Sequence, residues 1–329
     1  MPKGLTFDLP RFPLADIPTP VHRLERLSAY LGGPGIMMKR DDMTGLAFGG
    51  NKTRKLEFLV ADALARGADT LLTAGALQSN HCRQTAAAAA KAGKRCDLVL
   101  GGAAPSVPEG NFLLDTLLDA RIHWAGSDRR GETLDEVEAS LRKEGLNPCL
   151  IPYGGSSALG AAGYCMAMAE LSAQLPFRQR SVDAIVFASS SGGTHAGLIA
   201  GALAFGFTGR ILGVCVEKGE ELLPGGILSL ARGTAGLLGA PDLVPEGTVV
   251  LLDHRYAGEG YGVVGPRERE AIRLLARLEG IFLDPVYTAK AMGALIDMVG
   301  RREFTKKENV LFWHTGGTPA LFAYAGDIT

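Results

Sequence analysis

The sequence has no excess of charge of either sign. Its 329 residues include 34 lysines and arginines against 35 aspartates and glutamates, which gives a formal net charge of −1. Proteins that bind nucleic acid or anionic membranes usually carry a basic excess, so neither partner is expected. A long hydrophobic run is also missing, because the most apolar stretch, residues 197–207, is too short to cross a bilayer. With no signal-like apolar segment near the N-terminus, we expect a cytoplasmic protein.

Cysteine is scarce and scattered. The chain has five cysteines, an odd number, and no C-x-x-C pair. This pattern argues against a disulfide framework and against a zinc site, and no metal is expected. Glycine, by contrast, is abundant: its 44 residues are roughly double the average usage. They are spread along the chain without repeats, which indicates many tight loops.

Short apolar runs alternate with amphipathic or alanine-rich segments along most of the chain. This alternation predicts an α/β protein with parallel sheets covered by helices. The expected strands are residues 70–74, 96–100, 149–153, 184–188, 211–217, 249–252 and 310–313. The expected helices are residues 53–66, 83–92, 134–144, 158–173, 196–205, 267–278 and 289–299. Two loops rich in glycine and serine, 48–51 and 154–157, bracket a segment with its own alternation, which predicts an inserted domain.

A basic segment, GGNKTRK at residues 49–55, opens one of these helices. On one interpretation Asn51 caps the helix and Lys52 is a solvated charge. Three basic residues in a first turn oppose the helix dipole, however, and are unfavourable unless burial or an anion compensates. A lysine whose pKa is lowered by burial forms Schiff bases. Lys52 is therefore a candidate nucleophile.

The turn after the predicted strand 70–74 has the sequence GALQSNHCR and leads into an alanine-rich helix. Ser79 or Asn80 is suited to cap that helix, which is one complete explanation of both residues. Alternatively, the free amides at the helix start receive a carboxylate. Ser79 and His81 lack a surrounding G-x-S-x-G elbow, so an acyl-transfer triad is not indicated.

The segment SSSGGTHAG, residues 189–197, joins a predicted strand to a predicted helix. Small residues let backbone amides converge there, and the helix dipole favours a dianion. The segment has neither G-K-[ST] nor G-x-G-x-x-G, so a phosphate of some non-nucleotide cofactor is favoured. A plain strand–helix turn is the alternative. A phosphate cradle together with a lysine able to form a Schiff base suggests pyridoxal phosphate.

The sequence resembles the fold-type II pyridoxal-phosphate enzymes of the D-cysteine desulfhydrase and 1-aminocyclopropane-1-carboxylate deaminase group. The resemblance extends from Phe12 to Tyr324. It rests on PTPVHRLERLS (18–28), KRDD (39–42), GGNKTRKLEFL (49–59), TAGALQSNHCRQTAA (73–87), SGGTHAGL (191–198), GEGYG (258–262), LLARLEGIFLDPVYTAKAM (274–292) and HTGGTPALFAY (314–324). It implies a tryptophan-synthase-β-like fold of two domains, each with an open, mostly parallel twisted sheet. The larger, cofactor-binding domain would comprise residues 1–48 and 156–329, and the smaller, mobile domain residues 49–155, in a homodimer.

The resemblance also implies roles for individual residues. Lys52 is expected to hold the cofactor as a Schiff base, Asn80 to bind its ring hydroxyl, and Thr288 to face its pyridine nitrogen. The implied catalytic residues are Lys52, Ser79, Tyr261 and Tyr287. The implied cofactor-binding residues are Lys52, Asn80, Ser191, Gly192, Gly193, Thr194, Tyr287, Thr288 and Thr315. The implied residues around a small amino-acid substrate are Ser79, Asn80, His81, Thr315 and Gly316.

Two positions separate the branches of this group. The deaminase branch has glutamate facing the pyridine nitrogen and leucine where this chain has Thr315, whereas Thr288 and Thr315 match the desulfhydrase branch. A neutral hydroxyl leaves the ring a weaker electron sink, which is sufficient when the leaving group is a thiolate. We therefore expect α,β-elimination from D-cysteine, giving pyruvate, hydrogen sulfide and ammonia. The α-proton would be removed by Lys52 on one face or by Ser79 or Tyr261 on the other.

Three alternatives stay open on the sequence. L-cysteate sulfo-lyases share the lysine, the SNH turn and a GEGYG-like segment, and they expel sulfite. A sulfonate needs cationic or multiple donors, for which the chain offers Arg83, His195, His254 and Arg255. A 1-aminocyclopropane-1-carboxylate deaminase and a non-catalytic cofactor-binding protein are the less favoured alternatives.

Overall fold

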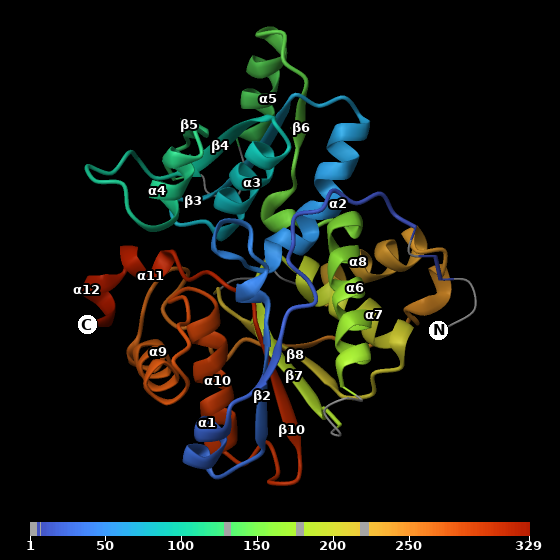
Figure 1. Ribbon diagram of the computed structural model, residues 1–329, viewed down its shortest axis with the longest axis vertical. Helices are drawn as coiled ribbons and strands as arrows, with labels where there is room; N and C mark the ends of the chain where they lie inside the picture. Colours follow the sequence, from blue (N-terminus) through green and yellow to red (C-terminus); the bar gives the residue numbers. More distant parts are fainter. Residues whose placement is uncertain (1–4, 7, 128–132, 176–180, 218–223) are drawn as a thin grey trace.

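Two sheets organise the chain (Figure 1). The computed structural model describes residues 5–6, 8–127, 133–175, 181–217 and 224–329. The larger sheet has the order β1 (Val21–Arg23), β2 (Gly35–Arg40), β10 (Asn309–His314), β7 (Ala184–Ser189), β8 (Arg210–Cys215) and β9 (Leu251–Asp253). Its strands are parallel except for β1, which is antiparallel to β2. The smaller sheet, β5 (Arg121–Trp124), β4 (Arg95–Gly101), β3 (Thr70–Ala76) and β6 (Pro148–Leu150), is parallel throughout.

The larger sheet is buried on both faces. Successive side chains of a strand point to opposite sides, and on each side they pack into a separate apolar core. Val186 and Phe312 pack into one core, and Phe187 and Trp313 pack into the other. The first core is covered by α1 (Glu25–Leu31), α9 (Pro266–Glu279) and α10 (Thr288–Gly300). The opposite face is covered by α6 (Ala158–Gln174), α7 (Gly193–Phe205) and α8 (Pro224–Leu237) (Figure 1). The predicted α/β class and the fold with two mostly parallel sheets are confirmed.

The smaller sheet has its own apolar core. It packs with α2 (Asn51–Ala65), α3 (Asn80–Lys91), α4 (Gly110–Leu117) and α5 (Leu134–Lys143). Leu56, Leu71 and Leu98 are buried together there. All four strands fall within the predicted insertion, but its bounds, residues 49–155, and its mobility stay predictions.

Each predicted strand and helix overlaps an observed element, with shifts at the ends. The largest difference concerns 149–153: β6 ends at Leu150, and Tyr153 begins a short 3₁₀ helix, η3 (Tyr153–Gly155). Helix α8 was not predicted, because four glycines weaken its local helical preference. It forms through burial of Ile227, Ala231 and Ala235 against its neighbours. Also unpredicted were β1, β2, β5, α1, α4, α11 (Ala320–Ala323) and α12 (Ala325–Ile328).

In the described part of the chain, no helix combines the length and apolar character needed to cross a membrane. The loops of the two sheets line a common cavity. The loops beyond the carboxyl ends of β3, β7 and β10, together with η3 after β6, all contribute to its lining.

Candidate active site

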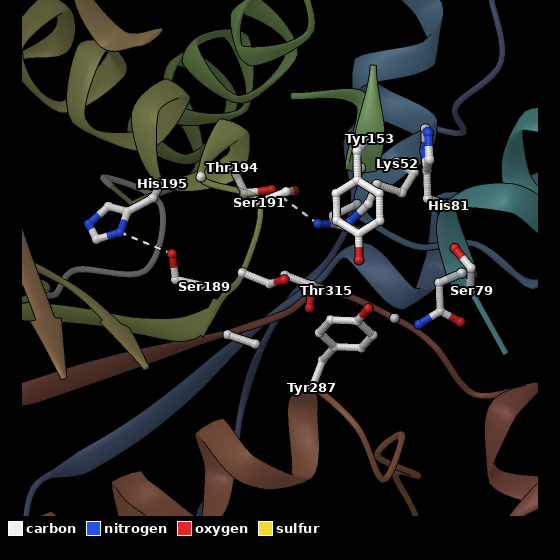
Figure 2. A pocket seen from close by; sticks show the side chains of 17 residues that line it. Lys52, Ser79, His81, Tyr153, Ser189, Ser191, Thr194, His195, Tyr287 and Thr315 are labelled. Atoms are coloured by element: carbon white, nitrogen blue, oxygen red, sulfur yellow. Dashed lines mark hydrogen bonds between the residues drawn. The ribbon is translucent and has the colours of Figure 1, made fainter. Parts of the chain in front are cut away.

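The cavity lies where the loops of the two sheets meet (Figure 2). Its lining includes ten of the thirteen predicted site residues: Lys52, Ser79, Asn80, His81, Ser191, Gly192, Thr194, Tyr287, Thr315 and Gly316. Asn51, Tyr153, Gly154, Ala188, Ser189, Ser190 and His195 complete it. The predicted residues Gly193, Tyr261 and Thr288 lie outside the lining and are described below.

Lys52 is the second residue of α2, and its position depends on the glycine that precedes the helix. Gly50 has φ of +128°, and a Cβ there would lie 3.1 Å from Gln84 Oε1 and 3.2 Å from Thr315 O. A side chain is therefore excluded at this close crossing of two loops. Lys52 Nζ donates to Asn51 Oδ1 over 3.0 Å.

The Lys52 amine is tuned toward its neutral form. Burial lowers its pKa from 10.5 to about 8, with the charge of Asp284 opposing the shift and that of Arg83 adding to it. A neutral amine is the form that attacks an aldehyde. Lys52 therefore has the chemistry that the sequence predicted for it.

The start of α2 is anchored by Arg54. Its guanidinium donates to Asp41 Oδ1 over 2.8 Å and to Glu170 Oε2 over 2.9 Å. Asp41 is buried and also accepts from Trp313 Nε1 over 2.8 Å. Paired in this way, the two carboxylates balance a buried cation and tie the helix that carries Lys52 to the larger sheet.

The loop after β7 has the predicted form of an anion cradle. Gly192 adopts φ of +81° and α7 begins directly after it, so the first turn of that helix faces the cavity. Asn51 Nδ2 donates to Thr194 Oγ1 over 3.0 Å. Gly193 does not line the cavity, and its N–H donates to Ser156 Oγ over 3.1 Å. The same Ser156 hydroxyl donates to Ser191 Oγ over 2.8 Å, which fixes the loop from behind.

A second buried lysine, which the sequence analysis did not single out, stands behind this loop. Lys55 Nζ donates to Gly154 O over 3.1 Å and to Ser156 Oγ over 3.4 Å. Burial, and then the charge of Lys52, hold its pKa well below the usual range. A nearby dianion would favour the charged form of Lys55. The sequence signal that could have identified Lys55 was its place as the third basic residue at the start of α2.

The turn after β3 begins α3 as predicted. Ser79 is the cap, and its Oγ accepts from Cys82 N over 3.2 Å. A cap role and a role at the cavity are compatible, since Ser79 and Asn80 also line it. His81 Nε2 contacts Thr73 Oγ1 at 2.9 Å, and burial keeps the pKa of His81 well below its usual range. His81 is therefore a neutral, positioned side chain.

Two tyrosines are hydrogen-bonded to each other at the cavity wall. Tyr261 Oη and Tyr287 Oη lie 2.7 Å apart, and their rings meet edge to face with centroids 5.8 Å apart. Burial raises the pKa of both well above 10, so both stay phenols. Tyr287 lines the cavity and Tyr261 stands behind it. Tyr153, which the sequence analysis did not identify as a site residue, enters the cavity opposite Tyr287 (Figure 2).

Thr288 does not line the cavity, and its expected place opposite the pyridine nitrogen stays a prediction. Its Oγ1 donates to Asp284 Oδ1 over 2.6 Å and accepts from Asp284 N over 2.8 Å. The carboxylate of Asp284 caps the first turn of α10, and the threonine side chain is turned into that cap, fully buried. Thr315 is the threonine that lines the cavity, and no carboxylate lies among the described lining residues.

The candidate sulfonate-binding cations do not gather at the cavity. Arg83 is buried with its Nη2 donating to Gly49 O over 2.9 Å, and Arg255 is paired with Asp253 and Glu303. His254 is exposed. His195 lines the cavity, but burial lowers its pKa to about 3, so it is neutral. Among the described lining residues, Lys52 is the one whose side chain can carry a positive charge near neutral pH.

These residues fit pyridoxal phosphate. They offer a near-neutral amine for its aldehyde, a glycine-rich helix start with Lys55 behind it for its phosphate, and Tyr287 for its ring. A Cβ on Gly193 would lie 2.7 Å from Ser156 Oγ and 3.0 Å from Lys55 Nζ, so the cradle requires glycine there. Among the described residues, no cluster of three histidine, cysteine or acidic side chains could hold a metal ion.

Comparison with known proteins agrees with this chemistry. The model of the pyridoxal-phosphate dependent enzyme family matches residues 13–316. The chain is 44% identical over 322 residues to a D-cysteine desulfhydrase of Klebsiella pneumoniae (strain 342), covering 96% of each chain. It is also 44% identical over 321 residues to a D-cysteine desulfhydrase of Salmonella choleraesuis (strain SC-B67), again covering 96% of each chain.

Solved structures give the same picture. The crystal structure of a homologue of 1-aminocyclopropane-1-carboxylate deaminase superposes with a TM-score of 0.89 at 36% identity, covering 98% of this chain and 96% of that one. A fungal L-serine ammonia-lyase from Rhizomucor miehei superposes with a TM-score of 0.64 at 18% identity, over 92% and 94%, which shows the shared fold alone. The chain belongs to the family of pyridoxal-phosphate-dependent enzymes, in the group that holds D-cysteine desulfhydrases and homologues of 1-aminocyclopropane-1-carboxylate deaminase.

Proposed function

We propose that the protein is a D-cysteine desulfhydrase, which converts D-cysteine and water to pyruvate, hydrogen sulfide and ammonia. The observation that carries the proposal is a cavity whose described lining holds one cationic side chain, Lys52, and no carboxylate. The relatives at 44% identity over 96% of the chain support the same substrate. When bound, pyridoxal phosphate supplies an electron-withdrawing ring that eases loss of the α-proton and of the β-substituent of an amino acid.

The chain's own residues divide the remaining work. Lys52 holds the cofactor aldehyde, and its amine, with a pKa of about 8, takes a proton readily near neutral pH once it is free. The Tyr261–Tyr287 pair keeps a proton at Tyr287 Oη, where it can be donated to a departing thiolate. Ser79, Asn80 and Thr315 offer neutral donors to the substrate and the cofactor. The residue that takes the α-proton is Lys52 on one face, or Ser79 or Tyr261 on the other.

The same lining disfavours the two catalytic alternatives. Opening a cyclopropane needs a strong electron sink, which a carboxylate at the ring nitrogen maintains, and the described lining has none. A sulfonate is best bound by fixed cations. Arg83, which is the nearest candidate, is buried outside the lining with its Nη2 bonded to Gly49 O.

A substrate panel tests the proposal. D-cysteine, L-cysteine, L-cysteate and 1-aminocyclopropane-1-carboxylate are supplied in parallel, and pyruvate, 2-oxobutyrate, sulfide and sulfite are measured. We expect pyruvate with sulfide from D-cysteine. Sulfite from L-cysteate as the dominant product, or 2-oxobutyrate from the cyclopropane, would replace the proposed substrate.

The Lys52→Ala variant tests the site itself. It should lose both the visible absorbance of the bound cofactor and turnover, because no other amine lines the cavity in the described residues. Lys91→Ala, which removes an exposed lysine at the end of α3, is the matched control and should change neither. A homodimer is proposed from the resemblance and a cytoplasmic location from the lack of a signal-like apolar segment in the sequence. The mass of the purified protein in solution checks the first.

A further inference from the structure

We propose that Asn111, on α4, is a positioning residue that fixes the amide orientation of Asn80. The inference rests on the proposed function, because it concerns the atom that Asn80 presents to the bound cofactor. Asn111 is fully buried and lies outside the cavity lining. It would act only through Asn80, which lines the cavity.

A backbone carbonyl, which can only accept a hydrogen bond, sets the orientation of Asn111. Asn111 Nδ2 lies 2.8 Å from Gln78 O, and a carbonyl oxygen can only accept. The nitrogen end of the Asn111 amide must therefore face this oxygen. The orientation of the Asn111 side chain is set by a group that has no alternative state.

The second hydrogen of the same amide then sets Asn80. Asn111 Nδ2 also lies 2.8 Å from Asn80 Oδ1. Were Asn80 flipped, two donors would face each other in a buried place, which is costly. Asn80 therefore keeps its oxygen toward Asn111. Within the described part of the chain its Nδ2 has no protein acceptor and is left for a ligand in the cavity.

Asn111 is itself held rigidly. Its backbone N–H donates to Gln78 Oε1 over 2.8 Å, while Gln78 Nε2 donates to Glu109 O over 3.1 Å. Gly110 has φ of +56°, and a Cβ there would lie 2.5 Å from Gln78 Oε1. The start of α4 is thus clamped onto the turn that carries Asn80. This clamp keeps a donor, not an acceptor, aimed at the cavity.

Asn80 is expected to bind the ring oxygen of pyridoxal phosphate, so the orientation of its amide would affect the charge on that oxygen. A donor on that oxygen draws away its negative charge, and the oxygen then holds less tightly the proton on the neighbouring Lys52 nitrogen. An acceptor in the same place would have the opposite effect. Asn111 would therefore tune the proton affinity at Lys52 in the loaded enzyme without touching the cofactor.

The test is Asn111→Asp, which keeps the size of the side chain but replaces its donor by an acceptor. The pH midpoint of the visible absorbance change of the bound cofactor should rise by about one pH unit. Cofactor affinity, measured by equilibrium dialysis, should fall about tenfold. Asn111→Ala removes the donor without reversing it and should shift the midpoint in the same direction by less. If Asn111→Asp does not fold, Asn111→Ala still tests the inference.

Thr116→Ala is the matched control on the same helix. Its Oγ1 donates to Phe112 O, away from Asn80, so the absorbance midpoint should stay at the parent value. A visible band with an unchanged midpoint in both Asn111 variants would overturn the inference alone. A parent protein with no visible band after incubation with pyridoxal phosphate would overturn the proposed function, and the inference with it.

Discussion

Asn51 Nδ2 donates to Thr194 Oγ1 over 3.0 Å, which joins the start of α2 to the first turn of α7. The other end of the same amide accepts from Lys52 Nζ over 3.0 Å. One side chain therefore links the reactive amine to the phosphate cradle across two elements far apart in sequence. The interpretation of Asn51 as a helix cap is wrong, because the cap position belongs to Gly50 and Lys52 N–H donates instead to Gln84 Oε1 over 3.1 Å.

The buried amine predicts a pH dependence of cofactor loading. Only the neutral Lys52 amine attacks an aldehyde, and burial lowers its pKa from 10.5 to about 8. The rate at which the cofactor-free protein captures pyridoxal phosphate should rise with pH and level off above about 8. Stopped-flow absorbance across this range measures the rate. A rate that keeps climbing toward the titration of an ordinary lysine, about pH 10.4, would contradict the lowered pKa.

The phosphate cradle predicts a steric requirement at Gly193. A Cβ there would lie 2.7 Å from Ser156 Oγ and 2.9 Å from Ser156 Cα. Overpacking of this kind costs about 1–3 kcal/mol, so Gly193→Ala should weaken cofactor binding about tenfold or more. Gly300→Ala, at the end of α10 with nothing within 4 Å, is the control and should bind normally. If Gly193→Ala and the parent protein bound pyridoxal phosphate with equal affinity in a titration, the loop after β7 would not be the phosphate cradle.

The two threonines should behave differently when their hydroxyls are removed. Thr288→Val loses its buried hydrogen bonds with Asp284, so the free energy of unfolding should fall by about 1–3 kcal/mol. Thr315→Val, at the cavity, should leave urea stability within about 0.5 kcal/mol and lower kcat/KM. A larger loss of kcat/KM in Thr288→Val than in Thr315→Val would indicate that Thr288, and not Thr315, acts on the bound cofactor.

The tyrosine pair should act as a unit. Tyr287→Phe and Tyr261→Phe each break the 2.7 Å contact between the hydroxyls, and each should lower kcat about 100-fold, as expected for loss of a general acid. The double variant should be little worse than either single variant, because the two residues share one proton path. Tyr256→Phe removes a hydroxyl bonded to Asp297, outside the cavity, and should keep the parent kcat. Strictly multiplicative losses would show that the hydroxyls act separately.

The sequence by itself determined the features that depend on near neighbours along the chain. The near-continuous apolar runs of β7 and β10 specify strands buried on both faces. The start of α3 follows from the capping residue Ser79. The basic first turn of α2 marks Lys52 because it opposes the helix dipole. Ten of the predicted site residues meet at one cavity for this reason: each belongs to a loop directly beyond a strand or to a helix start.

Tertiary structure decided what depends on partners distant in sequence. Lys55 reaches Gly154 across 99 positions, and Asn111 reaches Asn80 across 31. No local pattern marks either contact. The direction of the Thr288 hydroxyl depended on Asp284, which is only four residues away, but the choice between the helix cap and the cavity was made by how α10 packs. Local periodicity predicts which residues stand at the ends of strands, whereas packing alone determines where each side chain points.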